Sequence, residues 1–342
     1  MKIGSIDVHE RVLVIAEIGA NHEGNLDEAK RLIEAAAKAG ADAVKFQTYR
    51  AEKLVASSET QRRTHFRRLE LTDEAFQTLA QVALEYGVIF LSTPFDVESV
   101  DLLDPLMPAF KIASGDLTAA PLVAHIASKG KPIILSTGMA DLAEIAEAIG
   151  VIEDASPLGT EAPVVLLHCV SSYPTPDAEA QLQAIPYLRD RTGRLIGYSD
   201  HTLGIEACLA AVALGARVIE KHFTFDKSRT TMRDHQLSAD PADLAQLVKG
   251  VRRIEAMLGE CAKGLRSVES ANRVSMRRSL AARVGIPAGT VIAASMLTVL
   301  RPGTGLAPSQ IGDAVGHRAA RALQPGEIVT ADAIEGVAAC AQ

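Results

Sequence analysis

Short apolar runs alternate with longer amphipathic stretches from residue 12 to about residue 258. The amphipathic stretches predict helices; the clearest, residues 26–40, places Leu and Ile at helical spacing and stops at Gly40. The runs are almost continuously apolar, which indicates strands buried on both faces, as in a parallel sheet. There are eight such runs, at residues 12–19, 41–48, 88–94, 109–115, 132–138, 164–170, 194–200 and 216–223.

Eight strand–helix units in about 250 residues have the count and length of a (β/α)8 barrel. An open, doubly wound sheet would also alternate in this way, and the polar residues decide between the two. They stand at the carboxyl end of nearly every run: Glu17, Lys45, Thr93, Ser114, Ser136, His168, Asp200 and His222. An open sheet would gather such residues near one crevice, whereas a barrel brings all eight strand ends to one mouth. We therefore predict an α/β chain with a TIM barrel.

The pattern changes near the end of the last helical stretch. Residues 263–278 are polar and basic, which indicates a linker with a frayed helix. Residues 279–338 contain short strand-like runs separated by Pro-Gly turns, typical of a small β-rich domain. The predicted organisation is a barrel domain over residues 1–262, the linker, and a second domain over residues 279–338. A domain of that size has a thin core and is expected to lean on something else.

Composition limits the class of protein further. Hydrophobic residues make up 48% of the 342 residues and aromatic residues only 4%, with no Trp, so the core must be built from Ala, Leu, Ile and Val. The net charge of −7 argues against a general nucleic-acid binder, which needs a basic face. An anionic substrate must therefore be met by a few well-placed Lys or Arg side chains.

The chain also lacks the marks of a membrane or secreted protein. No apolar run reaches the roughly 18 residues of a membrane span, and the first residues do not have the pattern of a secretory signal. The four cysteines, Cys169, Cys208, Cys261 and Cys340, show no CxxC spacing. Free thiols in a reducing cytoplasm are the simplest interpretation.

Two lysines inside apolar strands are the first candidates for chemistry. An unpaired ammonium group at Lys45 or Lys111 would be costly to bury. A structural ion pair would explain either lysine alone. Two of them, near the hydroxyl-rich strand ends STPF, SGD and STGM, indicate a site for a phosphate or carboxylate group.

Two histidines end neighbouring strands of the predicted barrel. His201 and His222 could share one divalent metal and leave positions open for water and substrate, although each alone could be a hydrogen-bonded rim histidine. His168 lies deeper in its strand, and an inward-facing barrel histidine is as good an interpretation of it as any other. Glu17 could act in proton transfer, orient a sugar hydroxyl, or pair with Lys45. Glu220 alternates onto the face of His222 and could support it.

At this point the sequence resembles a known family. The segments AEIGANHEG, ADAVKFQT, FLSTPFD, FKIASGD, ILSTGM, LLHC with YPTP, GYSDHT and IEKHFT together resemble the sialic acid (N-acetylneuraminate) synthases, a family that includes legionaminic and pseudaminic acid synthases. The tail, with RRSLAARVGIPAGTVI, LTVLRPGTG and VGHRAAR, resembles that family's antifreeze-like (SAF) domain. The resemblance covers nearly the whole chain.

The resemblance implies condensation of phosphoenolpyruvate with an N-acetylated hexosamine such as N-acetylmannosamine, with Mn²⁺ or Mg²⁺ as the metal. It also implies a domain-swapped homodimer in which the SAF domain lends an arginine, Arg301, to the partner subunit. The positions that match the phosphoenolpyruvate site are Lys45, Thr93, Lys111, Ser114 and Ser136, with Ser199 beside the metal ligands His201 and His222. The positions that match residues holding the amino sugar are Glu17, Tyr173, Asp234 and Arg301. Of all these, Glu17, Lys45, Lys111 and Asp234 are the expected catalytic residues.

Three departures from the family pattern concern the sugar. Ser171, expected to contact substrate, stands where the family commonly has Asn; residues 232–235 read MRDH in place of GPDH; and residues 56–71 offer no Asn. The reaction class is therefore better defined than the sugar. The alternatives are a diacetamido sugar, as in legionaminic or pseudaminic acid synthesis; a 3-deoxy-ulosonate phosphate synthase, which the SAF-like tail disfavours; and a carbohydrate-binding protein that has kept the scaffold.

Overall fold

The computed structural model describes residues 1–337, so that Cys340 and the last residue of the predicted second domain lie outside the described part. The contacts divide the chain into two compact units, one spanning Met1–Gly259 and one that begins at Glu260. Each unit is described by itself. Within residues 1–337, no helix has both the length and the apolar character needed to cross a membrane.

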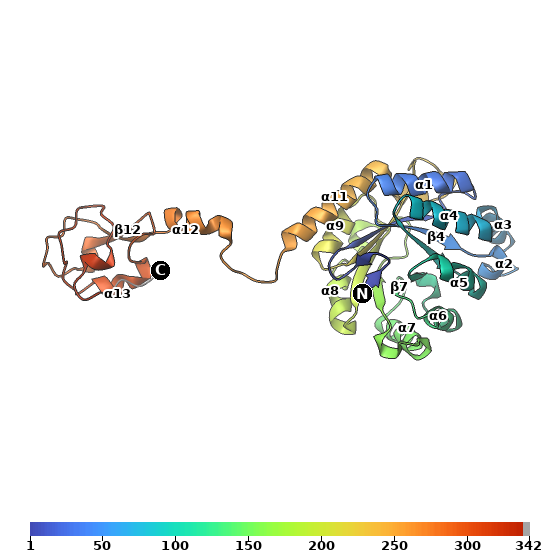
Figure 1. The fold of residues 1–342 in the computed structure, drawn as a ribbon, viewed down its shortest axis with the longest axis horizontal. Coiled ribbons are helices and arrows are strands. Elements are labelled where there is room, and N and C mark those ends of the chain that lie inside the picture. Colours follow the sequence, from blue (N-terminus) through green and yellow to red (C-terminus); the bar gives the residue numbers. More distant parts are fainter. Residues whose placement is uncertain (338–342) are drawn as a thin grey trace. The chain divides into compact units, whose positions relative to one another are not determined.

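The first unit is a barrel of eight parallel strands surrounded by helices (Figure 1). The strand order is β5-β4-β3-β10-β9-β8-β7-β6, which follows the chain around the ring and confirms the barrel over the open sheet. The strands are β3 (Leu13–Gly19), β4 (Ala43–Thr48), β5 (Ile89–Pro94), β6 (Phe110–Ile112), β7 (Ile133–Ser136), β8 (Val164–His168), β9 (Leu195–Asp200) and β10 (Val218–His222). All eight predicted strands are present.

Helices cover the outside of this ring (Figure 1). They are α1 (Leu26–Lys38), α2 (Ala51–Leu54), α3 (Thr60–Leu69), α4 (Asp73–Glu85), α5 (Val97–Leu103), α6 (Ala120–Ala127), α7 (Leu142–Ala155), α8 (Ala184–Thr192), α9 (Glu206–Ala213), α10 (Asp234–Leu237) and α11 (Pro241–Leu258). The predicted helix at residues 26–40 is α1, which begins where the Asn25 side chain accepts from the Asp27 and Glu28 amides.

A short hairpin, β1 (Lys2–Ile3) and β2 (Ile6–Asp7), was not predicted. Ile3 and Val8 are fully buried and pack against residues inside the ring, such as Leu13 and Val218, near the starts of their strands. The hairpin therefore seals the amino-terminal end of the barrel. Strands of two residues are too short to produce a periodic pattern in the sequence.

Alternate residues of each strand point into the ring, and their character changes from one end to the other. Ile15, Ala43 and Leu167 belong to an apolar inner cluster, whereas charged side chains follow toward the carboxyl ends. Gly197 has no room for a side chain, because a Cβ added there would approach Val218 O to 2.5 Å. The apolar floor and the sealed end leave only the carboxyl-terminal mouth for polar chemistry.

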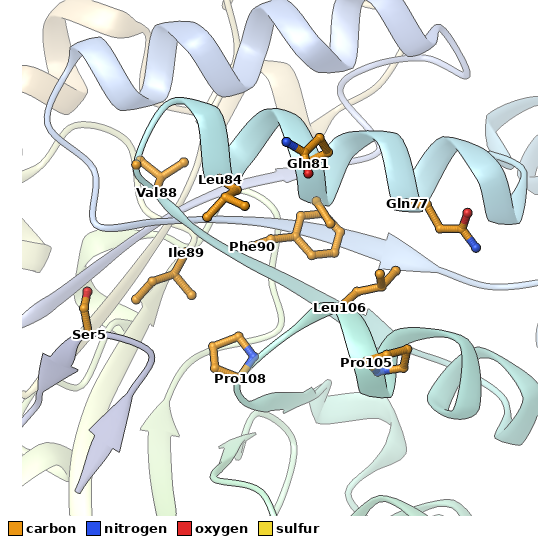
Figure 2. Close-up of a pocket in the computed structure, with 12 residues that line it drawn as sticks. Ser5, Gln77, Gln81, Leu84, Val88, Ile89, Phe90, Pro105, Leu106 and Pro108 are labelled. Carbon is orange, nitrogen blue, oxygen red and sulfur yellow. The ribbon is translucent and has the colours of Figure 1, made fainter.

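The strands β5 and β6, at the two ends of this order, lack a backbone ladder with each other among the described residues. A cavity of about 480 Å³ lies beside β5, between α4 and the short 3-10 turn η1 (Asp104–Leu106) (Figure 2). Its lining includes Leu84, Val88, Ile89 and Leu106 and no charged residue. It lies at the start of β5, away from the strand ends where barrel enzymes place their chemistry.

The second unit contains α12 (Ser270–Met276), β11 (Ser279–Ala282), β12 (Leu297–Leu300) and α13 (Ile311–Ala314). Strands β11 and β12 form an antiparallel pair, and the rest of the unit is joined by single bridges such as Ile286–Leu323 and Ala319–Ile334. The unit thus has fewer regular strands than predicted, because closely spaced turns interrupt its ladders. Its small core includes Leu280, Ile292 and Val329.

Candidate active site

A cavity of about 740 Å³ opens at the carboxyl ends of the barrel strands. All eight strands, or the loops directly after them, contribute to its lining. The lining residues are Glu17, Lys45, Gln47, Arg62, Thr93, Phe95, Lys111, Ala113, Ser114, Gly115, Ser136, Met139, Cys169, Ser171, Ser172, Tyr173, Ser199, His201, Glu220, His222 and Arg233. The structure therefore brings most of the predicted site residues to one place.

Lys45 lies at the centre of a buried charge cluster. Its Nζ is 2.7 Å from Glu17 Oε2 and 3.8 Å from Glu220 Oε2, and it donates to Thr93 Oγ1 at 3.1 Å. The three charged groups come from neighbouring strands, since Glu17 pairs with both Lys45 and His222 in the strand register. Glu17 thus pairs with Lys45, one of the three roles expected for it.

The two carboxyl groups of this cluster differ in proton affinity. Burial raises the pKa of Glu17 to about 7; Glu220 adds to the rise and Lys45 opposes it. Burial acts on Glu220 in the same direction, but Lys111 and Lys45 together bring the pKa of Glu220 below its ordinary value. Glu220 therefore holds the negative charge, and Glu17 is the carboxyl group that exchanges a proton near neutral pH.

Lys111, on β6, has a different environment. Its Nζ donates to Ser136 Oγ at 2.7 Å and to the Ile112 carbonyl oxygen at 3.0 Å, both neutral acceptors. Burial lowers the pKa of Lys111, and the positive charge of Lys45 adds to this effect against the pull of Glu220. Two buried ammonium groups facing one cavity form a ready site for an anion.

The serines line the same wall as Lys111. Ser114 Oγ accepts from the Gly138 amide at 3.0 Å and lies 3.1 Å from Cys169 Sγ. A Cβ at Gly138 would lie 2.5 Å from Ser171 Oγ, so that only glycine lets these hydroxyls converge. Ser199 Oγ donates to Glu220 Oε1 at 3.1 Å.

His201 and His222 lie side by side, with ring centroids 5.5 Å apart. His201 Nδ1 is 2.7 Å from the Val170 carbonyl oxygen, which leaves Nε2 on the cavity side of the ring; the buried His222 Nδ1 has no hydrogen-bond partner among the described residues. Burial lowers the pKa of both rings. Residues 1–337 contain no cluster of three or more His, Cys, Asp or Glu side chains able to hold a metal. These two imidazoles fit a metal that takes its remaining ligands from water and substrate.

Tyr173 closes one side of the site. Its ring centroid is 4.2 Å from that of His201, and the Arg233 guanidinium lies 5.0 Å from the centre of the Tyr173 ring. Asp234, next in the chain, is largely buried, and this burial raises the pKa of its carboxyl group. Asp234 thus comes close to the histidine pair without lining the cavity. Arg301 belongs to the second unit, where it follows β12.

Two of the polar residues at the carboxyl ends of the strands do not face the cavity. His168 points toward the helix layer, where its Nε2 is 2.8 Å from the Ala180 carbonyl oxygen and its ring stacks on Tyr198, so the interpretation of an inward-facing histidine is wrong. The alternation along β8 turns Leu167 inward instead. The Asp200 carboxylate is fully buried against Lys221 Nζ at 2.7 Å, behind the strand ends.

Several residues that line the cavity were not predicted from the sequence. Gln47 donates to Glu17 Oε1 at 3.3 Å, and its position two residues after Lys45 on the same strand could have indicated it. Arg62, in α3, and Arg233 carry no such signal, because loops and helices outside the strand pattern bring them to the mouth.

A barrel with charged groups concentrated at the carboxyl ends of its strands is the architecture of an enzyme. The NeuB family model matches residues 32–263 and the SAF domain model matches residues 277–335. The chain belongs to the NeuB family of sialic-acid-type synthases and carries its SAF domain.

Relatives of the chain are synthases of several related acids. The N,N'-diacetyllegionaminic acid synthase of Legionella pneumophila is 40% identical over 336 residues, 94% of each chain. The N-acetylneuraminate-9-phosphate synthase of Mus musculus is 34% identical, covering 94% of this chain and 92% of its own. The crystal structure of N-acetylneuraminic acid (sialic acid) synthetase from Leptospira borgpetersenii, in complex with citrate, superposes with a TM-score of 0.75 at 36% identity, covering 80% of this chain and 94% of that one.

Proposed function

We propose that this protein condenses phosphoenolpyruvate with an N-acetylated hexosamine such as N-acetylmannosamine, in the cytoplasm. A carbon–carbon bond forms between C3 of phosphoenolpyruvate and the sugar aldehyde carbon, water adds at C2 of phosphoenolpyruvate, and phosphate leaves. The product is a nine-carbon 2-keto acid. The observation that carries this proposal is the pair of buried ammonium groups, Lys45 and Lys111, that line one cavity.

Phosphoenolpyruvate would occupy the part of the cavity between these lysines. Its phosphate and carboxylate groups would be held by the two ammonium groups and by the hydroxyls of Thr93, Ser114 and Ser136, which all line the cavity. Charge supports this assignment, because the cluster holds two lysines against one firmly ionised carboxylate, Glu220. A bound anion would balance the remaining positive charge.

His201 and His222 would hold a divalent metal, Mn²⁺ or Mg²⁺, with Ser199 beside it. Bound there, the metal would supply Lewis-acid polarisation of the sugar aldehyde. Glu17, whose pKa is raised to about 7, is suited to give or accept a proton at the sugar hydroxyl or carbonyl oxygen. Tyr173, Ser171 and Asp234 would hold the sugar at the mouth of the same cavity.

A diacetamido sugar is a second candidate acceptor. The relative named for N,N'-diacetyllegionaminic acid is 40% identical, against 34% for the relative named for N-acetylneuraminate 9-phosphate. Ser171, which stands where the family commonly has Asn, lines the cavity and would contact the sugar. Legionaminic or pseudaminic acid synthesis would use the same lysines and histidines and differ only in the sugar contacts.

The test is product analysis by mass spectrometry with phosphoenolpyruvate, Mn²⁺ and a panel of acceptors: N-acetylmannosamine, diacetamido-trideoxyhexoses and arabinose 5-phosphate. We expect phosphate release and a nine-carbon acid with at least one acetamido sugar, lost in excess chelator and restored by Mn²⁺. Turnover of arabinose 5-phosphate alone would point to a 3-deoxy-ulosonate phosphate synthase. Sugar binding without any phosphate release would contradict an enzymatic function.

A further inference from the structure

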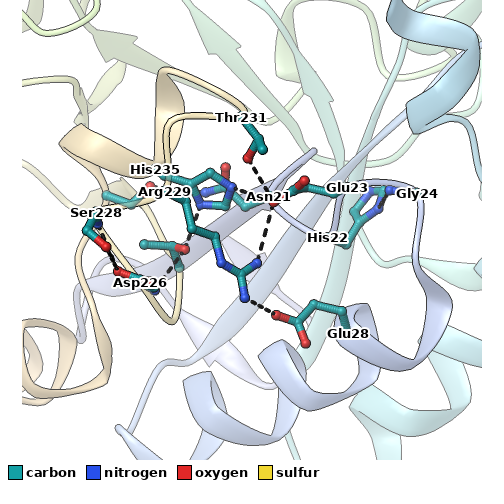
Figure 3. Close-up of polar contacts among 12 residues, drawn as sticks. Asn21, His22, Glu23, Gly24, Glu28, Asp226, Ser228, Arg229, Thr231 and His235 are labelled. Atoms are coloured by element: carbon teal, nitrogen blue, oxygen red, sulfur yellow. Dashed lines mark hydrogen bonds and ion pairs between the residues drawn. The ribbon is translucent and has the colours of Figure 1, made fainter.

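A cluster of polar contacts outside the cavity joins the loop after β3 to the segment between β10 and α11, residues 223–240 (Figure 3). This segment carries Arg233 and Asp234, the residues beside Tyr173 and the histidine pair. The loop after β3 contributes Asn21 and Glu23, and the cavity does not include either of them.

One carboxylate oxygen of Glu23 gathers contacts from three residues of the segment. Thr231 Oγ1 donates to Glu23 Oε1 at 3.0 Å, His235 Nε2 lies 3.3 Å from it, and Arg229 NH1 lies 3.5 Å from it. Figure 3 shows Thr231, Arg229 and His235 all directed at Glu23, with Arg229 reaching on to Glu28 of α1 at 3.1 Å. Three residues of the segment thus contact one carboxylate oxygen of Glu23, and Arg229 adds a second ion pair with Glu28.

His235 makes this contact rigid. Its side chain is fully buried, and its other ring nitrogen, Nδ1, is 2.7 Å from Thr224 Oγ1. Both ring nitrogens are therefore engaged, Nε2 with Glu23 in the loop after β3 and Nδ1 with Thr224 at the start of the segment. Because Asp234 precedes His235 directly, fixing this ring fixes the backbone that carries the Asp234 carboxyl group.

Asn21 holds the same backbone from a second direction. Its Nδ2 donates to Ser238 Oγ at 3.0 Å and to the Phe223 carbonyl oxygen at 2.9 Å. Ser238 Oγ in turn donates to the Asp234 carbonyl oxygen at 2.5 Å. Asp234 therefore lies between two supports, both of which originate in the loop after β3.

The backbone of Glu23 shows that its carboxylate matters. Its φ is +52°, in the left-handed region that non-glycine residues rarely adopt. Gly24 follows at φ +78°, and a Cβ there would lie 2.3 Å from the Arg68 carbonyl oxygen. A glycine at position 23 would relieve the strain, so a glutamate there indicates a requirement for the side chain.

We propose that Glu23 is a positioning residue that fastens the segment 223–240 over the mouth and so places Asp234 and Arg233 for the acceptor sugar. The part concerning the sugar rests on the proposed function; the fastening itself does not. We expect phosphoenolpyruvate binding to be independent of Glu23, because Lys45 and Lys111 are held by Thr93, Ser136 and the Ile112 carbonyl oxygen, all outside the segment 223–240.

The test is Glu23→Gly, which removes the carboxylate and gives the backbone a residue that adopts φ +52° freely. We expect the apparent KM for the acceptor sugar to rise on the order of 10- to 100-fold, as when catalytic geometry loosens. The thermal stabilisation by phosphoenolpyruvate should not change. Trypsin should cleave the substrate-free full chain faster after Lys227, Arg229 and Arg233 than it cleaves the wild type. Glu23→Gln, which keeps an acceptor oxygen, should show a KM and a cleavage rate between those of the wild type and those of Glu23→Gly.

Gln181→Gly is the matched control, because Gln181 has φ +44° and lies outside the active-site cavity. It should leave both KM and the tryptic cleavage rate at wild-type values. Wild-type KM in Glu23→Gly would overturn the positioning role, with or without faster cleavage. If the wild type itself turned over no acceptor sugar, the proposed function would fail, and unchanged tryptic cleavage in Glu23→Gly would then overturn the fastening separately.

Discussion

The two buried lysines of the cavity differ in what compensates their charge. Lys45 has the Glu17 carboxyl group 2.7 Å away, with Glu220 close behind it. In the described part of the chain, Lys111 has only a serine hydroxyl and a main-chain carbonyl oxygen as direct partners. Without a bound anion, Lys111 is therefore the more expensive of the two to bury, and the two positions should respond differently to substitution.

Lys111→Met should abolish the thermal stabilisation by phosphoenolpyruvate while leaving the ligand-free melting temperature unchanged or higher. The methionine fills the same space without a charge, and a ligand at about 100 times its Kd stabilises a protein by about 2.7 kcal/mol. Differential scanning fluorimetry with and without phosphoenolpyruvate measures both quantities. Lys45→Met is the comparison and should lower the ligand-free melting temperature, because it leaves the buried carboxyl groups of Glu17 and Glu220 close together without the ammonium group between them. A large ligand-free loss in Lys111→Met would favour a structural role.

Asp116 gives a prediction for pH. Burial raises the pKa of its carboxyl group to about 6, against the opposing effect of Lys111, and its buried Oδ2 has no hydrogen-bond partner within residues 1–337. The folded state thus binds the proton more tightly than the unfolded state, so the contribution of Asp116 to stability falls as pH rises from about 4 to 6. Asp116→Asn should stabilise the protein by about 2 kcal/mol at pH 7.5 and much less at pH 4. Urea unfolding at both pH values measures this, and an equal effect at both would contradict it.

At the scale of elements, the last barrel helix is tied to the first barrel strand by charged side chains. The Asp42 carboxylate accepts from the Val14 amide at 2.9 Å and pairs with Arg11 and Arg252, the latter on α11. Arg252 also donates to the Val12 carbonyl oxygen at 2.7 Å. This network joins α11 and β3 where the ring returns to its beginning.

Asp42→Ala should cost about 3 kcal/mol, because it leaves the buried Val14 amide without its acceptor and removes the partner of Arg252 NH2, while NH1 keeps the Val12 carbonyl oxygen and Glu255. Arg11→Ala is the control and should cost less than about 1 kcal/mol, since the Arg11 side chain is 54% exposed. Chemical denaturation followed by circular dichroism distinguishes the two. Equal losses would show that the ion pair with Arg11, not the buried acceptor, is what matters.

The sequence pattern was sufficient to predict the strands of the barrel and most of the residues that line the cavity, for one physical reason. A parallel strand covered on both faces must be apolar, so a charge near its carboxyl end, as at Lys45 or His222, stands out. Direction around the ring is harder to predict. His168 and Asp200 occupy strand ends but face outward, because alternation depends on register that the apolar runs do not define.

The rest of the site depends on contacts between distant segments. Glu23 contacts residues more than 200 positions later, and Arg62 reaches the mouth from a helix of charged residues. Nothing in the local sequence marks either one. Such residues become apparent only when the loops that follow the strands are placed next to one another.

At the scale of the whole molecule, Arg301 in the second unit is the remaining predicted sugar contact. We expect it to complete the active site of a partner subunit in a domain-swapped homodimer, with its guanidinium binding an acyl oxygen or hydroxyl of the sugar. Glu17→Ala and Arg301→Ala should each be nearly inactive as pure homodimers. Coexpressed, they should form heterodimers with one intact site and recover substantial activity. Heterodimers as inactive as their parents would show that Arg301 does not act in trans.

If phosphoenolpyruvate binds as proposed, the missing ladder between β5 and β6 would give it a mechanical role as well. The sheet is a strip whose two free edges meet at this junction, and Thr93 lies on one edge and Lys111 on the other. An anion bound by both Thr93 and Lys111 would link β5 to β6, which backbone hydrogen bonds do not connect in the part of the chain that the structure describes. The bound substrate would then complete the closure of the barrel between its two edge strands. Amide hydrogen exchange along β5 and β6 should slow more than in the other strands when phosphoenolpyruvate binds. Binding would thus make the junction between the two edge strands more rigid when the substrate is in place for reaction.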